Sequence, residues 1–189
     1  MPADAGCECR PMPGENAMAR NVEIKARIVS VESVFPAAAA LADGEPVTMV
    51  QDDTFFRCSN GRLKLRATAG NGGELIFYRR ADRSGPRESF YLVSPTTAPD
   101  ALRESLSLAY GEAGRVRKTR TLFLAGRTRI HLDRVEGLGD FLELEVALRD
   151  GEPVEAGKAR ARDLMGKLGI GRDQLVEGAY VDLLTSGTA

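Results

Sequence analysis

The chain has 189 residues, 43% of them hydrophobic, which suits one globular domain with a sizeable core and argues against a disordered protein. Its 26 basic and 27 acidic residues give a formal net charge of -1, so a uniformly basic nucleic-acid-binding protein is not expected. Three cysteines without a Cys-x-x-Cys pair, no secretory pattern at the N-terminus and no apolar run of membrane-spanning length favour a reduced, cytoplasmic protein that does not bind membranes.

The first residues, 1–19, are rich in proline and glycine and have no periodic pattern, so we expect a disordered tail before one domain over residues 20–187. Alternating apolar and polar residues then predict strands, and apolar residues at helical spacing predict helices. The expected strands cover residues 22–31, 47–57, 62–67, 74–80, 89–93 and 116–124, followed by a hairpin over 128–145. The expected helices cover residues 33–41, about 100–110, 153–168 and 173–184. Because most strand connections are short, this order favours an α+β fold, a mainly antiparallel sheet with helices packed outside.

The hairpin over residues 128–145 has one charged face and one aliphatic face. Successive side chains of a strand point to opposite faces, and here the polar ones fall on alternate positions of both strands. The charged face consists of Arg129, His131, Asp133, Glu143 and Glu145. Three carboxylates and a guanidinium backed by a continuous aliphatic face indicate the wall of a charged cavity.

Charged residues also recur at alternate positions of the other expected strands. The basic ones are Lys25, Arg62, Lys64, Arg66, Arg80, Lys118, Arg120 and Arg129, and the acidic ones are Glu23, Asp133, Glu143 and Glu145. If the sheet closes into a barrel, these faces turn inward together and line a polar tunnel. Buried charges need partners, so such a tunnel predicts a polyanion and a divalent cation. The alternative is an open sheet with one solvated face.

These residues resemble the CYTH family, the triphosphate tunnel metalloenzymes, which include class IV adenylyl cyclases, thiamine triphosphatases and inorganic triphosphatases. The resemblance covers residues 20 to about 185. It rests on Asn-Val-Glu-Ile-Lys at 21–25, Arg-Leu-Lys-Leu-Arg at 62–66, Val-Arg-Lys-Thr-Arg at 116–120, Leu-Asp at 132–133 and Gly-Leu-Gly-Asp-Phe-Leu-Glu-Leu-Glu at 137–145. It implies an eight-stranded antiparallel tunnel, a triphosphate substrate, and Mg²⁺ or Mn²⁺ as cofactor.

The resemblance also implies roles for individual residues. The eight basic residues, from Lys25 to Arg129, would bind phosphates. Glu23, Asp133, Glu143 and Glu145 would form the metal site, and Lys25, Glu143 and Glu145 would be catalytic. Asn21 stands where the family has glutamate, so it brings no charge and leaves open whether one or two metal ions bind. Two roles are open for His131: a general base, or a hydrogen-bonded residue that lines the tunnel.

The expected function is divalent-metal-dependent hydrolysis of an inorganic or organic triphosphate. The chain has no tryptophan and few other aromatic residues, and no base pocket is evident, which favours hydrolysis over nucleotide cyclisation. The alternatives are a class IV adenylyl cyclase that makes cyclic AMP and pyrophosphate from ATP, and a non-catalytic protein with a phosphate-binding tunnel. Asn21, which stands where the family has glutamate, is the residue that supports the second alternative. The expected partner is a small-molecule triphosphate, and the sequence is compatible with a homodimer.

Overall fold

The computed structural model of the chain describes residues 19–70, 72–80 and 85–186. The predicted N-terminal tail therefore lies outside the described residues, except for the backbone of Ala19. The side chain of Arg80, which the sequence assigns to the phosphate-binding set, also lies outside them.

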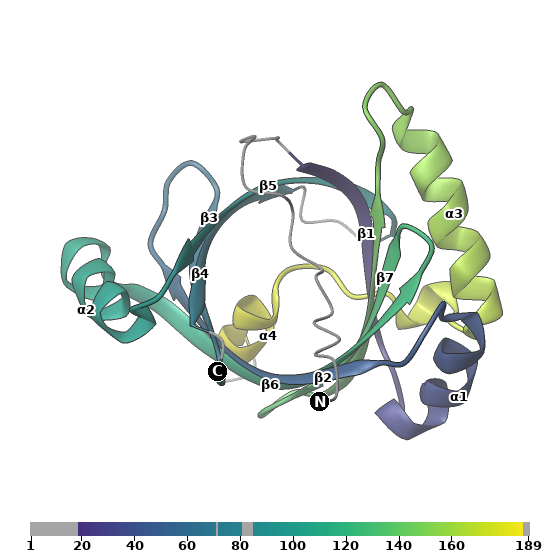
Figure 1. The fold of residues 1–189 in the computed structure, drawn as a ribbon, viewed down its shortest axis with the longest axis horizontal. Coiled ribbons are helices and arrows are strands. Elements are labelled where there is room, and N and C mark those ends of the chain that lie inside the picture. The colour runs from purple at the N-terminus through teal and green to yellow at the C-terminus, as the bar shows by residue number, and fades with distance from the viewer. Residues whose placement is uncertain (1–18, 71, 81–84, 187–189) are drawn as a thin grey trace, which may run out of the picture.

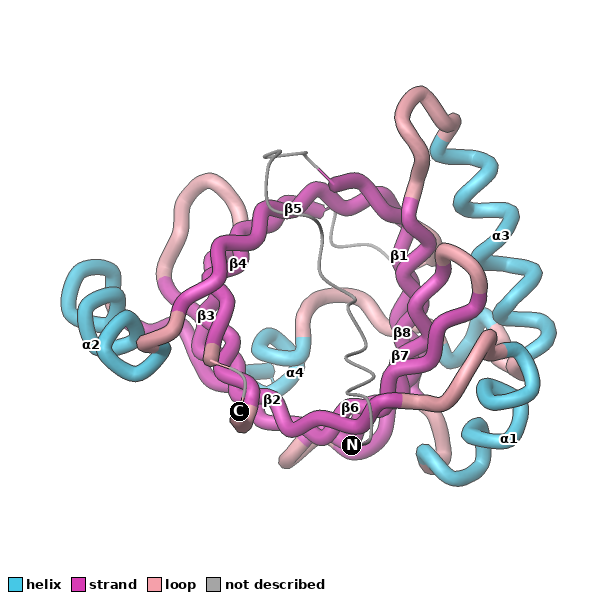
Figure 2. Tube along the Cα trace, viewed as in Figure 1, coloured by secondary structure: helices cyan, strands magenta, loops and turns pink. Residues whose placement is uncertain are grey.

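The described strands form one closed, antiparallel barrel (Figures 1 and 2). They are β1 (Ala19–Arg27), β2 (Val47–Phe56), β3 (Arg62–Thr68), β4 (Gly73–Arg80), β5 (Arg87–Thr96), β6 (Glu112–Ala125), β7 (Thr128–Val135) and β8 (Gly139–Ala147). Their order around the barrel is β1-β5-β4-β3-β2-β6-β7-β8, and β8 closes the ring by pairing with β1. Closure removes every unpaired edge of the sheet. The predicted eight-stranded antiparallel tunnel in an α+β fold is confirmed.

Three helices pack outside the barrel, as predicted. They are α1 (Val31–Leu41), α2 (Pro99–Tyr110) and α3 (Val154–Lys167). The helices α1 and α3 cover the side formed by β1, β7 and β8, whereas α2 lies on the opposite side against β2 and β3 (Figure 1).

The main hydrophobic core fills the space between the barrel and helices α1 and α3. It contains the outward-facing side chains of the strands with the alternating pattern, among them Val22, Ile24, Ile130, Leu132, Leu142 and Leu144. Burial of each such side chain contributes about 1.5–3 kcal/mol. Helix α3 approaches β1 so closely that a Cβ atom at Gly157 would lie 2.7 Å from Val22. The aliphatic half of the strand pattern therefore holds the helices, and the charged half is left facing the barrel interior.

The last predicted helix, over residues 173–184, is instead two separate pieces, η1 (Arg172–Gln174) and α4 (Tyr180–Ser186). The segment between them pairs with β1 through an Ala26–Leu175 bridge and a bond of 2.9 Å from the Val176 amide to the Lys25 carbonyl. It leads α4 to one end of the barrel (Figures 1 and 2).

A second hydrophobic cluster joins α4 to the inner face of the barrel. The inward-facing side chains Phe55, Val116, Val135 and Phe141 pack against Ala179, Tyr180 and Val181. The fit requires Gly114, because a Cβ atom there would lie 2.4 Å from Val181. Helix α4 therefore fills part of one barrel end rather than covering an outer face.

Candidate active site

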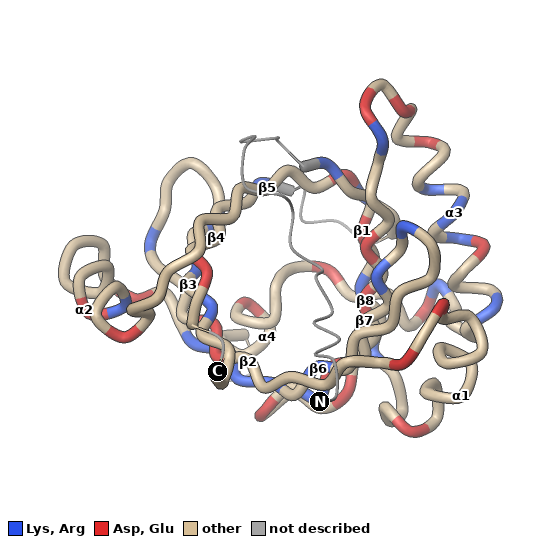
Figure 3. Tube along the Cα trace, in the orientation of Figure 1, with Lys and Arg blue, Asp and Glu red and all other residues tan. Residues whose placement is uncertain are grey.

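The strand register turns the predicted charged residues into the barrel interior. Side chains of directly paired residues lie on the same face of a sheet. The pairs are Glu23 with Glu145, Lys25 with Glu143, Arg120 with Asp133, His131 with Glu143, and Arg129 with Glu145. In Figure 3, basic and acidic positions recur along the strands that surround this interior. The structure thus brings together on one inner surface residues that lie far apart in the sequence, such as Glu23 and Glu145.

A first cationic cluster lies on β2 and β3. Arg66 donates two hydrogen bonds of 2.8 and 2.9 Å to the carboxylate of Asp53, and the Lys64 ammonium donates a third of 2.8 Å. Burial raises the pKa of Asp53, but Arg66 and Lys64 outweigh this and hold it well below the usual value. Burial, together with the charge of Arg66, lowers the pKa of Lys64 to about 7.

A second cationic cluster on β6 and β7 repeats this arrangement. Arg120 binds Asp133 through two hydrogen bonds of 2.6 and 2.5 Å, and Lys118 binds the same carboxylate at 3.1 Å. The hydroxyl of Tyr180 donates a further hydrogen bond of 3.0 Å to Asp133. Burial opposes the charge of Asp133, but Arg120 and Lys118 lower its pKa below the usual range. Both clusters therefore pair a Lys-x-Arg strand with an aspartate on the adjacent strand.

The two clusters form one continuous band, because β2 and β6 are neighbours in the barrel. Four basic side chains, Lys64, Arg66, Lys118 and Arg120, share the carboxylates of Asp53 and Asp133 there, so basic groups outnumber acidic ones in the band. Arginines held by a carboxylate keep further N–H groups for a second acceptor. The band is thus suited to bind a multiply charged anion.

The adjoining wall, on β8 and β1, carries the glutamates. Glu143 accepts a hydrogen bond of 2.6 Å from Arg120, and its other oxygen lies 3.5 Å from the Lys25 ammonium. Burial raises the pKa of Glu143, but Lys25 and Arg120 hold it well below its usual value. Glu145 is 3.4 Å from Arg129.

Glu23 faces a buried cation that the sequence analysis missed. The guanidinium of Arg87 on β5 lies 3.4 Å from the Glu23 carboxylate and is 1% exposed. Arg87 falls next to the undescribed residues 81–84, where the strand pattern was weak, and only the pairing of β1 with β5 brings it to Glu23.

The oxygen atoms on this wall fit a hard divalent cation. Glu23 and Glu145 lie directly opposite each other, and the buried side-chain oxygen of Asn21 has no hydrogen-bond partner among the described residues. Carboxylate and amide oxygens are the ligands that Mg²⁺ and Mn²⁺ prefer. In the described part of the chain no three His, Cys, Asp or Glu side chains yet converge on one point, since each glutamate is held by a basic residue.

His131 is a neutral lining residue in this structure. It is buried, and burial and the charge of Arg120 lower its pKa well below the usual value. Its Nδ1 atom has no hydrogen-bond partner among the described residues, and the nearest carboxylate oxygen, on Glu145, is 3.9 Å away. If His131 has the predicted hydrogen-bonded lining role, the hydrogen bond to the described residues is therefore not formed by its Nδ1 atom.

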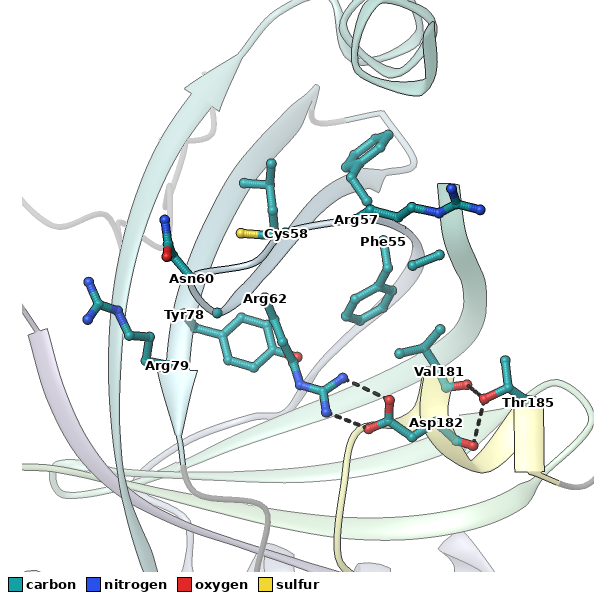
Figure 4. A pocket seen from close by; sticks show the side chains of 14 residues that line it. Phe55, Arg57, Cys58, Asn60, Arg62, Tyr78, Arg79, Val181, Asp182 and Thr185 are labelled. Atoms are coloured by element: carbon teal, nitrogen blue, oxygen red, sulfur yellow. Dashed lines mark hydrogen bonds and ion pairs between the residues drawn. The ribbon is translucent and has the colours of Figure 1, made fainter. Parts of the chain in front are cut away.

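Helix α4 adds contacts that the sequence analysis did not anticipate. The Lys25 ammonium donates to the Gly178 carbonyl at 3.1 Å and lies 3.8 Å from the centre of the Tyr180 ring. Arg62 forms a two-point ion pair with Asp182, each contact 2.8 Å long. Around this pair is a cavity of about 510 Å³, also lined by Phe55 and Tyr78 (Figure 4).

The sequence profile of the CYTH domain family matches residues 19–180. The chain belongs to the CYTH domain family. The predicted resemblance is thereby confirmed, and with it the barrel as the family's tunnel.

A curated CYTH relative is adenylate cyclase CyaB from Aeromonas hydrophila, which is 25% identical over 169 residues and is matched over 84% of this chain and 85% of its own length. The PH1012 protein from Pyrococcus horikoshii OT3 has the same fold, with a TM-score of 0.78 at 24% identity over 87% of this chain and 99% of that chain. A Hippeastrum protein described as having a dominant triphosphatase activity aligns with a TM-score of 0.63 at 18% identity, covering 90% of this chain and 96% of that one. At these identities the two solved structures support the fold.

None of the helices in the described ranges is long and apolar enough to cross a membrane.

Proposed function

We propose that this CYTH protein is a divalent-metal-dependent phosphohydrolase that releases phosphate from an inorganic or organic triphosphate. The observation that carries the proposal is the band of four inward-facing basic residues beside a wall of glutamates inside a closed barrel. A linear triphosphate with a bound divalent cation carries the complementary charges. The substrate is a small molecule rather than a nucleic acid, and the proposed location is the cytoplasm.

The cationic band would hold the phosphates. Arg66 and Arg120 suit bidentate binding of phosphate oxygens, and Lys64 and Lys118 add point charges beside them. Asp53 and Asp133, from the adjacent strands, would keep these cations oriented before the substrate arrives. Arg80 and Arg129 stay predicted members of the same set, and Arg62 stays a predicted phosphate contact at its outer end on β3, where Asp182 already binds it.

The glutamate wall would supply the reacting end. Asn21, Glu23, Glu143 and Glu145 would hold Mg²⁺ or Mn²⁺, which when bound neutralises charge on phosphate oxygens and activates water. Because the pKa of Glu143 is held low, this carboxylate is suited to orient a water molecule or bind a cation rather than to store a proton. Lys25, opposite Glu143, would stabilise charge that develops on the phosphate during transfer.

Nucleotide cyclisation is the second candidate. It is favoured by the cavity beside Phe55 and Tyr78, whose rings could receive a base, and by the name of the Aeromonas relative. Hydrolysis is preferred because the inner side of that end is packed with the apolar side chains of α4.

The test is incubation of the purified protein with tripolyphosphate, thiamine triphosphate or ATP, with Mg²⁺, Mn²⁺ or a chelator. Metal-dependent release of phosphate supports the hydrolase, whereas cyclic AMP with pyrophosphate supports the cyclase. Tight binding without either product would identify a non-catalytic phosphate-binding protein. Asp163→Asn, on the outer surface of α3, is a matched control that removes a carboxylate far from the barrel interior.

A further inference from the structure

The basic residues of β3 form a row that runs toward α4. Arg66, Lys64 and Arg62 occupy alternate positions of the strand, so their side chains share its inner face about 7 Å apart. Asp53, which binds the first two, belongs to the neighbouring strand β2 and is 2% exposed, so it is part of the barrel wall. The carboxylate that binds Arg62 has a different origin.

That carboxylate, Asp182, comes from α4 at the barrel end. Figure 4 shows Arg62 pointing toward Asp182 beside the cavity, and both side chains are partly accessible, at 25% and 41% exposed. On the other side, α4 is fixed by apolar packing of Tyr180 and Val181 against β6, β7 and β8. The Arg62–Asp182 ion pair therefore connects α4 to the β3 side.

Asp182 is held in this position by its own helix. Its second carboxylate oxygen accepts a hydrogen bond of 2.7 Å from the Ala179 amide, the reciprocal contact found at the start of many helices. Its negative charge is thereby held at the α4 end of the row of cations.

From this geometry we propose that Asp182 is a specificity-determining residue that limits the length of the phosphate chain; the inference rests on the proposed triphosphate function. A triphosphate on Lys64, Arg66 and the β6 cations stays clear of Asp182. A longer linear polyphosphate that extends along β3 brings a further anionic group to Arg62, where it must displace the Asp182 carboxylate and meets a like charge.

The test compares the dissociation constants of tripolyphosphate and tetrapolyphosphate by calorimetry, at constant ionic strength and without divalent metal so that no turnover occurs. Asp182→Asn removes the charge but keeps an oxygen for the Ala179 amide. We expect the ratio of the tetrapolyphosphate constant to the tripolyphosphate constant to fall about tenfold in this variant, the scale of one short-range like charge in a partly solvated site. Asp163→Asn on the outside of α3 should leave the ratio unchanged.

An unchanged ratio in Asp182→Asn, with tripolyphosphate still bound, overturns the length limit but not the proposed function. If the wild-type protein binds neither polyphosphate, the length limit is overturned, and the proposed function is overturned with it if tripolyphosphate with Mg²⁺ or Mn²⁺ also releases no phosphate. Should Asp182→Asn not fold, Asp182→Ser provides the same comparison, because serine also offers a hydroxyl acceptor near the Ala179 amide without a charge.

Discussion

The two charged walls of the barrel hold their carboxylates in different ways. On the β2–β3 and β6–β7 wall, each aspartate is buried and accepts at least three hydrogen bonds, two of them from one guanidinium. On the β1–β8 wall, Glu23 and Glu145 are 13% and 24% exposed, and their ion pairs to Arg87 and Arg129 are both 3.4 Å long.

This difference indicates two roles for residues of one chemical type. A buried aspartate with saturated oxygens orients the cations around it and has little capacity left for a metal ion. A partly exposed glutamate that is held by a long ion pair can exchange that ion pair for a cation. The family resemblance predicted Asp133 as a metal ligand beside the glutamates, but its saturated oxygens indicate that it acts as Asp53 does, as a positioning residue.

The largest predicted effect is on stability, from removal of an aspartate of the first wall. Asp133→Ala would remove the buried carboxylate that Arg120 and Lys118 share and would leave Arg120 with Glu143 alone, and we expect a loss of about 3–5 kcal/mol in the free energy of unfolding. Urea denaturation measures it. Tripolyphosphate should restore part of the loss, because the bound anion replaces the missing charge. A loss below about 1 kcal/mol, the scale of a surface ion pair, would contradict the distinction between the walls.

The second prediction concerns turnover after substitutions in the β1–β8 wall. Glu143→Gln or Glu145→Gln should lower the rate of phosphate release by about 100-fold or more, the scale of one lost transition-state contact. For Glu145 the free energy of unfolding should change by less than about 1 kcal/mol, since its ion pair is long and partly solvated. Lys25→Ala should also abolish turnover. Normal activity in all three variants would end the site assignment.

The alternation of residues along each strand was enough to predict which charges face inward. For Glu23, Lys25, Glu143 and Glu145 the side-chain direction follows from local periodicity, and barrel closure keeps that direction. Asp53 could not be chosen by this argument, because Asp52 beside it is equally charged. Only the register decides between them: Asp53 is paired with Arg66, while Asp52 binds Arg115 on the outer surface.

The position of α4 could not be predicted from local sequence patterns, for a different reason. Leu175, Val176, Tyr180 and Leu183 predict that the segment is buried, but not against which surface. That surface is set by long-range fit, such as the space that Gly114 leaves for Val181. No local sequence pattern therefore predicted that Tyr180 and Asp182 belong to the site.

A third prediction tests the protonation of the cationic wall. The pKa of Lys64 is lowered from 10.5 to about 7, so near pH 8 most molecules carry a neutral Lys64 before substrate binds. Tripolyphosphate favours the charged form, and binding should take up close to one proton more in the wild type than in Lys64→Arg, which stays charged. Calorimetry in two buffers of different ionisation enthalpy measures the difference. Equal proton uptake would place the Lys64 pKa in its ordinary range.

The same walls set the response to acid. The folded-state pKa values of Asp53, Asp133 and Glu143 are depressed, so the folded protein binds fewer protons than the unfolded chain. Their stabilising contribution is therefore present above the unfolded values near 4 and is lost as the pH falls through the folded values. We expect the free energy of unfolding to decline steeply below about pH 4. Asp53→Asn should show a shallower decline than the wild type, whereas Asp163→Asn should follow it more closely.

The smallest predicted effect is a gain in metal affinity at the glutamate wall. Asn21 contributes a buried oxygen, without a hydrogen-bond partner in the described part of the chain, but no charge, and Asn21→Glu would add a carboxylate two positions from Glu23 on the same face. We expect several-fold tighter Mn²⁺ binding, measured by electron paramagnetic resonance, because the affinity of oxygen sites rises with the number of charged ligands. Asn21→Gln, which lengthens the side chain without charge, is the control. If Asn21→Glu binds Mn²⁺ no more tightly than Asn21→Gln does, the cation does not lie beside position 21, and the metal site would have to be built from Glu23, Glu143 and Glu145 without it.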